Sequence, residues 1–346
     1  MRAQSYQTLA HGADSILFFQ MRRSVGACEK FHGAVIEHAG TDQTRVFREV
    51  KALGQELEQL GTKLLGAESR NSVGLIFDWD NYWALEYSSG PHKDLWYVDQ
   101  IYKTYRYFYE QNIGIDMLAF DADFSSYKIL LAPVLYMIKP GMKEALDQFV
   151  QAGGILVTGF MSGIVGESDN VYLGGYPGPL RQMSGIWVEE IDALAPGQQN
   201  TIQFSDGKKG KCGLLCDLMH LEGSEALAHY TEDFYSGYPA VTRNKWGEGQ
   251  VYYIGTEPDK ESLAYILDDI VAHAGVKSAL SEKTALEVVT RYKGKEQYCF
   301  VMNFTDTVQP LPHSLAGKVD LLSGRELEEH AELKPYDVLL IGETLV

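Results

Sequence analysis

The sequence predicts an α/β protein whose main domain is a doubly wound parallel sheet, followed by a small antiparallel β domain. Across residues 71–276, short apolar runs alternate with helix-like stretches, an order typical of a parallel sheet with helices on both faces. Residues 277–346 contain no convincing long helix, only short alternating runs separated by Gly, Pro and Asp. Residues 1–70 hold too few elements to close a core of their own, so we expect them either to need elements that are missing or to pack on the segments that follow.

The composition excludes several classes of function. With 346 residues, 45% of them apolar and 22% charged, the chain has an ordinary globular composition and room for about two to three domains. Its net charge of −17 argues against nucleic acid or an anionic membrane as a partner, because both attract clustered Lys and Arg. No apolar run approaches the roughly 18 residues of a membrane span, and no signal peptide opens the chain. We therefore expect a cytoplasmic protein that handles neutral ligands such as sugars.

The first part of the chain predicts a helix, a strand and a second helix. Residues 1–15 have the pattern of the end of an amphipathic helix closed by Gly12, so we expect the chain to open in mid-structure. Residues 14–21 are apolar enough for a buried strand. Without neighbours such a strand would expose two unpaired edges, so we expect it to pack against the α/β domain, to pair with another chain or to cause aggregation. The following helix, capped by Thr41 or Asp42, carries an apolar stripe: Val46, Val50, Leu53, Leu57, Leu60 and Leu64.

The remaining elements follow from short apolar runs and helix signals. In the central domain we expect strands at Val73–Phe77, Ile115–Ala119, Ile129–Ala132, Ile155–Thr158 and Val251–Ile254, and helices over residues 94–111, 140–152 and 258–274. Between residues 158 and 251 the chain reads as a long Gly-rich excursion. In the last domain the short runs predict a small β-sandwich or barrel, with strands at Ala285–Tyr292, Gln297–Asn303, Lys318–Leu322 and Val338–Ile341.

Candidate sites on the central domain are weak. Ligands of an open α/β sheet bind at the carboxyl ends of its strands, where Asp78-Trp79-Asp80-Asn81-Tyr82-Trp83 could stack a sugar, although packing is the better interpretation. After the strand that ends near Gly159, Ser162 is one place out of register for a hydrolase elbow and no Cys is present. We therefore expect this domain to be non-catalytic, which disfavours an amidotransferase-like enzyme.

Metal and cofactor sites are not expected. Cys212 and Cys216 have a spacing that could join a zinc site, but no second Cys or His pair completes it, so free thiols in a reducing compartment are the expectation. The turn Gly174–Pro179 is glycine-rich but fits neither a dinucleotide nor a phosphate loop.

The segment Glu29–Ala34 is the most suggestive. It follows the apolar run 14–21 by a short loop, where barrel enzymes place ligand-contacting groups. A carboxylate accepts hydrogen bonds from vicinal sugar hydroxyls, and a His three residues further on donates or accepts another. By itself this pair of residues would also fit the start of a surface helix.

The order of segments resembles glycoside hydrolase family 42, the β-galactosidases. The similarity covers most of the chain in the family's order, through residues 10–40, 45–57, 73–86, 130–141, 174–194 and 251–259. It implies that residues 1–70 are the C-terminal remnant of a (β/α)₈ catalytic barrel, that 71–276 form a trimerisation domain and that 277–346 form a small β domain. The resemblance assigns Glu29 and His32 to galactose contacts and Phe19 to the lining of the same pocket.

The same resemblance implies that catalytic residues are missing. The family's acid/base Glu and its nucleophile Glu lie upstream of the matched segments, and no segment here matches either. A retaining glycosidase needs two carboxyl groups about 5–5.5 Å apart, so we expect a fragment that is inactive alone, needs no metal or cofactor, and binds galactosides only if the rest of the barrel is supplied. The alternative is a non-catalytic trimerising or binding module left after loss of the barrel; a companion polypeptide would distinguish the two.

Overall fold

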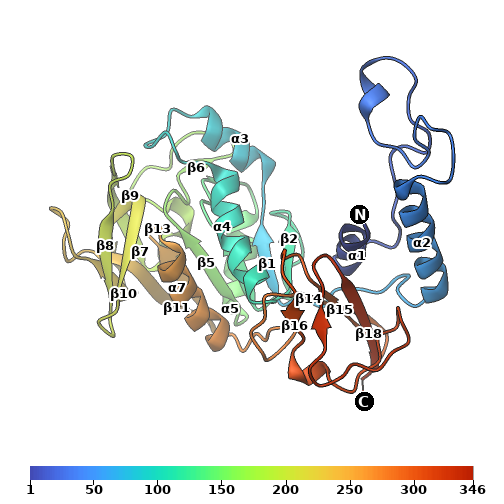
Figure 1. Cartoon of the computed structure of the whole chain (residues 1–346). Helices are drawn as coiled ribbons and strands as arrows, with labels where there is room; N and C mark the ends of the chain where they lie inside the picture. Colours follow the sequence, from blue (N-terminus) through green and yellow to red (C-terminus); the bar gives the residue numbers. More distant parts are fainter. Residues whose placement is uncertain (346) are drawn as a thin grey trace. The chain divides into compact units, whose positions relative to one another are not determined.

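The computed structural model describes residues 1–345, which form two compact units (Figure 1). The α/β unit comprises Asn71–Tyr109 and Ile115–Lys277, and the terminal unit combines the first 70 residues with Glu110–Gly114 and the described residues from Ser278 onward. Each unit has its own buried core. The beginning and the end of the chain thus share one unit.

The α/β unit is built on an 11-stranded mixed sheet. Five of its strands run parallel in the order β12-β5-β3-β1-β2. All five predicted strands are confirmed, at β1 Val73–Ile76, β2 Ile115–Leu118, β3 Ile129–Ala132, β5 Ile155–Gly159 and β12 Gly249–Ile254. The three predicted helices are also confirmed, at α4 Tyr97–Glu110, α5 Met142–Gln151 and α7 Lys260–His273.

The other part of the sheet is antiparallel, and here the expectation of a purely parallel sheet is wrong. The supposed Gly-rich excursion folds into strands that extend the sheet beyond β12 in the order β11-β10-β8-β9, with β7 also paired to β9, and β13, which follows β12 in the chain, pairs with β9 as well. Their bounds are β7 Ile186–Ala193, β8 Asn200–Phe204, β9 Lys209–Leu221, β10 Glu225–Tyr230, β11 Pro239–Trp246 and β13 Thr256–Pro258. Bulges interrupt the ladders β7–β9, β9–β13 and β10–β11, so the strict alternation that reveals a strand in a sequence is lost.

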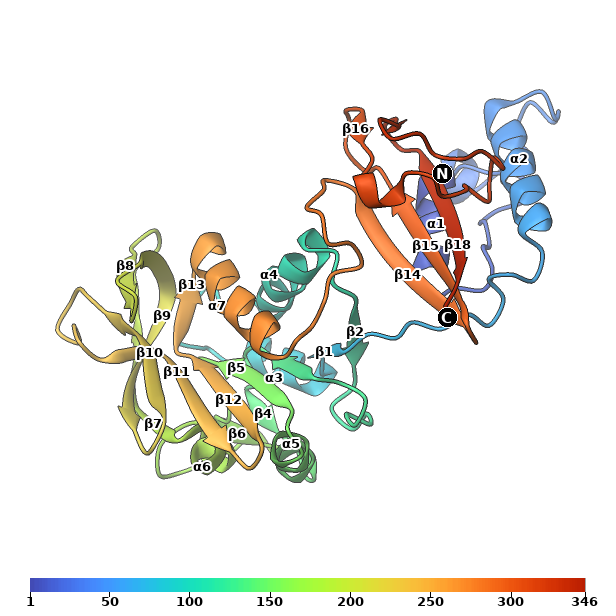
Figure 2. The same cartoon turned by 90° about the horizontal axis from the view of Figure 1, so that it is seen from below.

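Smaller elements surround the carboxyl ends of the parallel strands. Helix α3 follows β1 directly, and two short parallel strands, β4 and β6, pair beside it. Figure 2 places α4 and α7 on one face of the sheet and α5 and α6 on the other. The bounds are α3 Trp79–Tyr87, α6 Arg181–Ser184, β4 Met137–Ile138 and β6 Val165–Gly166.

The terminal unit packs two helices on a three-stranded antiparallel sheet. Helices α1 (Arg2–Ala10) and α2 (Arg45–Leu60) share a core with the sheet β14-β15-β18. Thr44, not Thr41 or Asp42, caps α2 by accepting a hydrogen bond from the Phe47 amide at 3.4 Å. The sheet strands are β14 Glu287–Lys293, β15 Glu296–Met302 and β18 Val338–Thr344, and a two-stranded ribbon pairs β16 Gln309–Pro310 with β17 Glu332–Leu333.

Two predicted strands of this unit are absent among the described residues. Residues 318–322 form only isolated bridges, from Val319 to Glu326 and from Asp320 to Ile341. Residues 14–21 form no strand either, because no neighbouring segment offers a hydrogen-bonding edge along their length. A strand is stable only when its backbone groups are paired. Apolar composition alone therefore misidentified residues 14–21.

Candidate functional site

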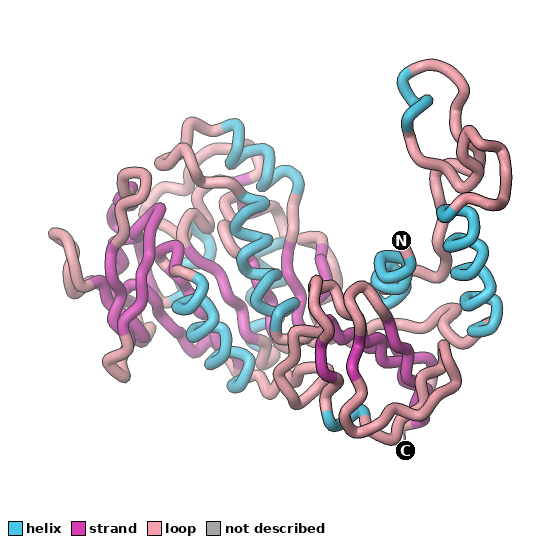
Figure 3. Tube along the Cα trace, viewed as in Figure 1, coloured by secondary structure: helices cyan, strands magenta, loops and turns pink. Residues whose placement is uncertain are grey.

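The predicted sugar-contact residues lie on one long loop between α1 and α2. Figure 3 shows residues 11–44 as loop, apart from one short 3₁₀ helix at Cys28–Phe31. A parallel bridge between Arg22 and Ile36 joins the two arms of this loop at its base. The amide of Ile36 donates to the Met21 carbonyl at 2.8 Å, and the amide of Arg23 donates to the Ile36 carbonyl at 3.0 Å.

Arg23 holds the loop together. Its Nη1 donates to Glu37 Oε2 at 2.7 Å, and its Nη2 donates to the carbonyl of Phe31 at 2.7 Å. The imidazole of His38 also contacts the Ser24 carbonyl, at 2.8 Å. These contacts fix the arms so that residues 25–33 project between them. This role of Arg23 could not be predicted from the sequence, because a cation near an apolar run with a carboxylate 14 residues later is too common to indicate an ion pair.

Glu29 and His32 stand together on the projecting part of the loop. Glu29 lies in the short 3₁₀ helix, and the backbone amide of His32 donates to the Glu29 carbonyl at 2.9 Å. Both side chains are exposed. The two residues can therefore offer a carboxylate and an imidazole to a hydroxylated ligand, as hydrogen-bond acceptor and as donor or acceptor.

Phe19 is on the incoming arm of the same loop and is 75% exposed. Leu17, Val25 and Phe31 are more exposed still. Among residues 1–345, no hydrogen bond or ring contact joins Phe19 to Glu29 or His32. The loop thus brings Glu29 and His32 together in one backbone turn, whereas Phe19 is on a different part of the loop.

The carboxyl end of β1 is occupied by structural contacts. Asp78 is buried and caps α3, and the ammonium of Lys139 lies 2.7 Å from its Oδ1 and 2.5 Å from Oδ2 of Asp80. Asn81 is fully buried, donating to the Val134 carbonyl at 3.1 Å and accepting from the Met137 amide at 2.9 Å. These polar groups hold α3 against the strand ends, as the packing interpretation predicts.

Two aromatic side chains of α3 remain half-exposed. Trp79 packs edge-on against Phe77, with ring centroids 5.0 Å apart, and lies 6.0 Å from the ring of Trp83. Yet Trp79 and Trp83 stay 58% and 50% exposed. Large half-exposed aromatic side chains next to each other are typical of surfaces that another molecule covers.

The turn after β5 has an elbow without a nucleophile. Met161 occupies the strained position, with φ +57°. Ser162 is fully buried, and its Oγ receives hydrogen bonds from the Leu135 amide at 3.0 Å and from Thr158 Oγ1 at 2.8 Å. A hydroxyl held in this way cannot reach a substrate. The expectation that this domain lacks hydrolase or amidotransferase chemistry at Ser162 thus has a structural reason.

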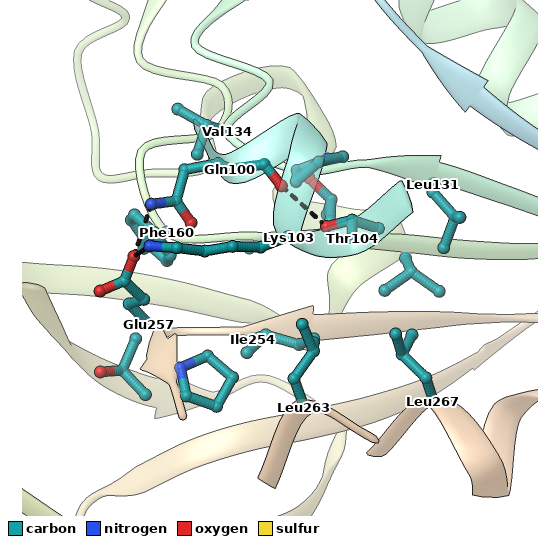
Figure 4. Close-up of a pocket in the computed structure, with 16 residues that line it drawn as sticks. Gln100, Lys103, Thr104, Leu131, Val134, Phe160, Ile254, Glu257, Leu263 and Leu267 are labelled. Carbon is teal, nitrogen blue, oxygen red and sulfur yellow. Dashed lines mark hydrogen bonds and ion pairs between the residues drawn. The ribbon is translucent and has the colours of Figure 1, made fainter. Parts of the chain in front are cut away.

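A small apolar cavity of about 50 Å³ lies beside this turn, between α4, α7 and the ends of β3, β5 and β12 (Figure 4). At its mouth Glu257 accepts a hydrogen bond from Gln100 Nε2 at 2.6 Å and pairs with the ammonium of Lys103. Thr104 turns its hydroxyl back to the Gln100 carbonyl at 3.0 Å. The polar groups around the mouth are satisfied by one another, and the walls carry no acid, base or nucleophile aimed inward.

Two further features are absent from the described part of the chain. Residues 1–345 contain no group of three or more His, Cys, Asp or Glu side chains that could hold a metal ion. Within the same range, no helix is both long and apolar enough to cross a membrane.

Comparison with known domain families gives three matches in chain order. Residues 1–60 match the family model described as β-galactosidase, residues 71–277 the β-galactosidase trimerisation domain, and residues 285–342 the β-galactosidase C-terminal domain. The match to the trimerisation domain coincides closely with the α/β unit.

Individual relatives agree. The chain is 44% identical to the β-galactosidase LacZ of Lactobacillus acidophilus and 45% identical to BgaP of Planococcus sp., over 99% of this chain and 51% and 52% of those proteins. It superposes on the β-galactosidase of Bacillus circulans sp. alkalophilus with a TM-score of 0.95 at 47% identity, covering 99% of this chain and 52% of that one. It superposes on a catalytic mutant of a family 42 β-galactosidase from G. stearothermophilus with a TM-score of 0.94 at 34% identity, covering 99% of this chain and 50% of that one.

The chain belongs to glycoside hydrolase family 42, the family of these β-galactosidases. It spans about half the length of the curated relatives it matches.

Proposed function

We propose that this chain is the C-terminal part of a family 42 β-galactosidase and supplies one side of its galactose-binding pocket. The observation that carries the proposal is the similarity to β-galactosidases along 99% of the chain, together with a loop that presents Glu29 and His32 to solvent. The reaction would be hydrolysis of terminal β-D-galactosides with retention.

Within that pocket the three loop residues have separate roles. Glu29 accepts hydrogen bonds from two neighbouring hydroxyls of galactose, and His32 exchanges one more. Phe19 offers an aromatic face to the apolar C–H side of the sugar. The acid/base and nucleophile carboxylates come from residues outside the segments that this chain matches, so the roles of Glu29 and His32 are in binding.

We assign the three segments of the chain to three tasks. Residues 1–70 complete the catalytic (β/α)₈ barrel, residues 71–276 form a homotrimer, and residues 277–346 form the small closing domain. Parallel strands with α4 and α7 on one face and α5 and α6 on the other (Figure 2) support a doubly wound core for the trimerisation domain. The half-exposed rings of Trp79 and Trp83 on α3 support a contact between copies of the chain at this helix.

Activity is tested by complementation. The purified chain alone should not hydrolyse a chromogenic β-galactoside, and adding a polypeptide with the first half of the Lactobacillus acidophilus relative should produce turnover. In the complemented enzyme, Glu29→Gln should raise KM and lower kcat/KM by at least about tenfold, the factor that loss of about 1.4 kcal/mol of binding produces. The matched control is Glu58→Gln, an exposed carboxylate on α2, which should leave both constants unchanged. Turnover by the unmixed chain that Glu29→Gln abolishes would make Glu29 catalytic and overturn the proposal.

Trimer formation is tested by light scattering after gel filtration. The chain should elute at about three times its 38.7 kDa mass, and Trp83→Asp should shift it towards the monomer, because a buried unpaired carboxylate is costly at an interface. Phe234→Asp, at an exposed ring elsewhere on the same unit, is the control and should keep the trimer. A monomeric wild-type chain contradicts the assignment of residues 71–276.

A further inference from the structure

Two of the four cysteines lie on the same strand, in a place that the sugar chemistry does not use. Cys212 and Cys216 are both on β9 and both buried, 1% and 0% exposed. In a regular strand, residues four apart are about 13 Å from each other. The strand is not regular here, because Leu214 between them has φ +63°.

The strand register shows how far the irregularity shortens this distance. On the neighbouring strand β13, Thr256 pairs with Cys216, and Pro258, only two residues further on, pairs with Cys212. The two cysteines therefore stand opposite residues that are two apart. That spacing places their Cα atoms about 6.5–7 Å from each other on one face of the sheet, at the upper end of the 4.4–6.8 Å range usual for disulfides.

The two thiols also interact. The nearness of the two thiols lowers the pKa of Cys216, because the Cys212 thiol can donate to its thiolate, and raises the pKa of Cys212. Sγ of Cys216 further contacts Oγ1 of Thr256 at 3.7 Å. The pair therefore favours a single thiolate, which is the reactive form of cysteine.

An open cavity reaches the pair from the side of Cys212. Cys212 and the bulge residues Gly213 and Leu214 line an open cavity of about 330 Å³, together with the polar side chains of Gln198 and Asp259. A small polar oxidant can enter such a space, whereas the bulk of a protein or peptide cannot. Cys28 and Cys299 differ, since the first is exposed and the second is buried on another sheet.

We propose that Cys212 and Cys216 form an oxidisable dithiol that a peroxide converts into an intrachain disulfide. The thiolate sulfur attacks one peroxide oxygen, the O–O bond breaks, and the other oxygen leaves as hydroxide that takes up a proton to become water. The second sulfur then attacks the sulfenic sulfur, an S–S bond forms, and the S–OH oxygen leaves with the second thiol's proton as water. The two sulfurs together lose two electrons, which reduce one hydrogen peroxide to two waters.

Peptide mapping of the full chain tests the proposal. The protein, in a Cys28→Ser background, is treated with hydrogen peroxide, denatured, alkylated with N-ethylmaleimide and digested with trypsin. Lys211 and Arg243 bound one tryptic peptide that contains both cysteines. That peptide should carry no alkyl group and weigh two hydrogens less than the reduced peptide, and dithiothreitol should restore both alkylation sites. Cys299 is the internal control: burial raises its pKa to about 12, and it should stay fully alkylated.

Other outcomes overturn the proposal. One is a peptide that keeps two alkyl groups at a peroxide concentration that oxidises Cys28 in the unmodified sequence. The others are a peptide that gains oxygen atoms without an S–S bond, and a disulfide between chains. A second variant separates chemistry from folding. In Cys212→Ser the Cys216 thiolate has no partner, so oxidation should stop at a sulfenic acid that dimedone labels; a folded variant that stays unlabelled also contradicts the dithiol.

Discussion

Arg291 is the single side chain on which the terminal unit depends most. Its guanidinium is 1% exposed and donates to the carbonyls of Leu9 and Ala13 at 2.9 Å each, and also to that of Ala67. It thereby binds carbonyl groups at and just beyond the C-terminal end of helix α1, where a cation is favoured. One side chain from β14 thus anchors the N-terminal helix and the segment that follows α2.

Replacing this cation should destabilise the terminal unit. We expect Arg291→Met to lower the free energy of unfolding by about 2–4 kcal/mol, because several buried carbonyls lose their donors at once. The control is Arg70→Met: this exposed cation lies over the ring of Tyr292 at 4.7 Å and should cost less than about 1 kcal/mol. Urea denaturation followed by circular dichroism measures both. Equal losses for the two variants would show that the buried network is unimportant.

Asp217 makes the α/β unit sensitive to pH. It is fully buried on β9; desolvation raises its pKa to about 8, although the hydrogen bond from the Tyr253 hydroxyl at 2.8 Å opposes the shift. The folded state therefore keeps a proton that the unfolded chain loses near pH 4. Between about pH 4 and pH 8 the unfolded state binds fewer protons, so stability falls as pH rises through this window.

Asp217→Asn should remove this slope, because an amide cannot ionise but can still accept from Tyr253. Relative to wild type, the variant should gain stability steadily from pH 5 to pH 8 and gain little more above pH 8. Asp233→Asn, an exposed change in the same unit, should follow the wild-type profile. Denaturant midpoints at five pH values give the comparison, and parallel curves for Asp217→Asn and wild type would mean that Asp217 ionises freely in the fold.

At the scale of elements, α2 is packed along only part of its length. The predicted apolar stripe is helical from Val46 to Leu60, whereas Leu64 lies beyond the helix end. Within the helix only the C-terminal part of the stripe is buried: Leu53 and Leu60 are below 6% exposed, whereas Val46 and Val50 are half-buried. Leu53→Ala should therefore cost about 2–4 kcal/mol of stability, and Val46→Ala less than about 1 kcal/mol. Thermal or urea unfolding of both variants checks this gradient. Similar losses at the two positions would mean that the whole stripe is covered.

Elements with a simple pattern could be predicted, and bulged ones could not. The buried runs at β3 and β5 are continuous and apolar, so their sequence alone indicates strands of a parallel sheet. In β9 the burial alternates irregularly and Leu214 adopts a positive φ, so periodicity does not reveal a strand. The loop between α1 and α2 was likewise only partly predictable from the sequence. Glu29 and His32 were found through family resemblance, whereas the Arg23 contacts that shape their loop depend on pairing between distant arms.

At the scale of the whole chain, the apolar run near Phe19 conflicts with its surroundings. Residues 14–21 have the composition of a buried strand but lie exposed in a loop. Exposed apolar surface of this kind marks an interface or promotes aggregation. The proposed assignment of residues 1–70 to a barrel resolves the conflict, since neighbouring barrel strands would pair with both edges of the run and cover its side chains.

Hydrogen exchange of the full chain can follow this change directly. In the chain alone, the amides of residues 14–20 and 25–31 should exchange within seconds, while those of Arg23 and Ile36, which bond across the base of the loop, should exchange more slowly. Adding the complementing first half should slow exchange over residues 14–21 by about a hundredfold or more, because opening a paired strand costs several kcal/mol. The amides of β15 serve as the control and should exchange equally slowly in both samples. Strong protection of residues 14–21 without the added half would show that the chain covers this segment by itself, and the barrel assignment would then lose its main physical argument.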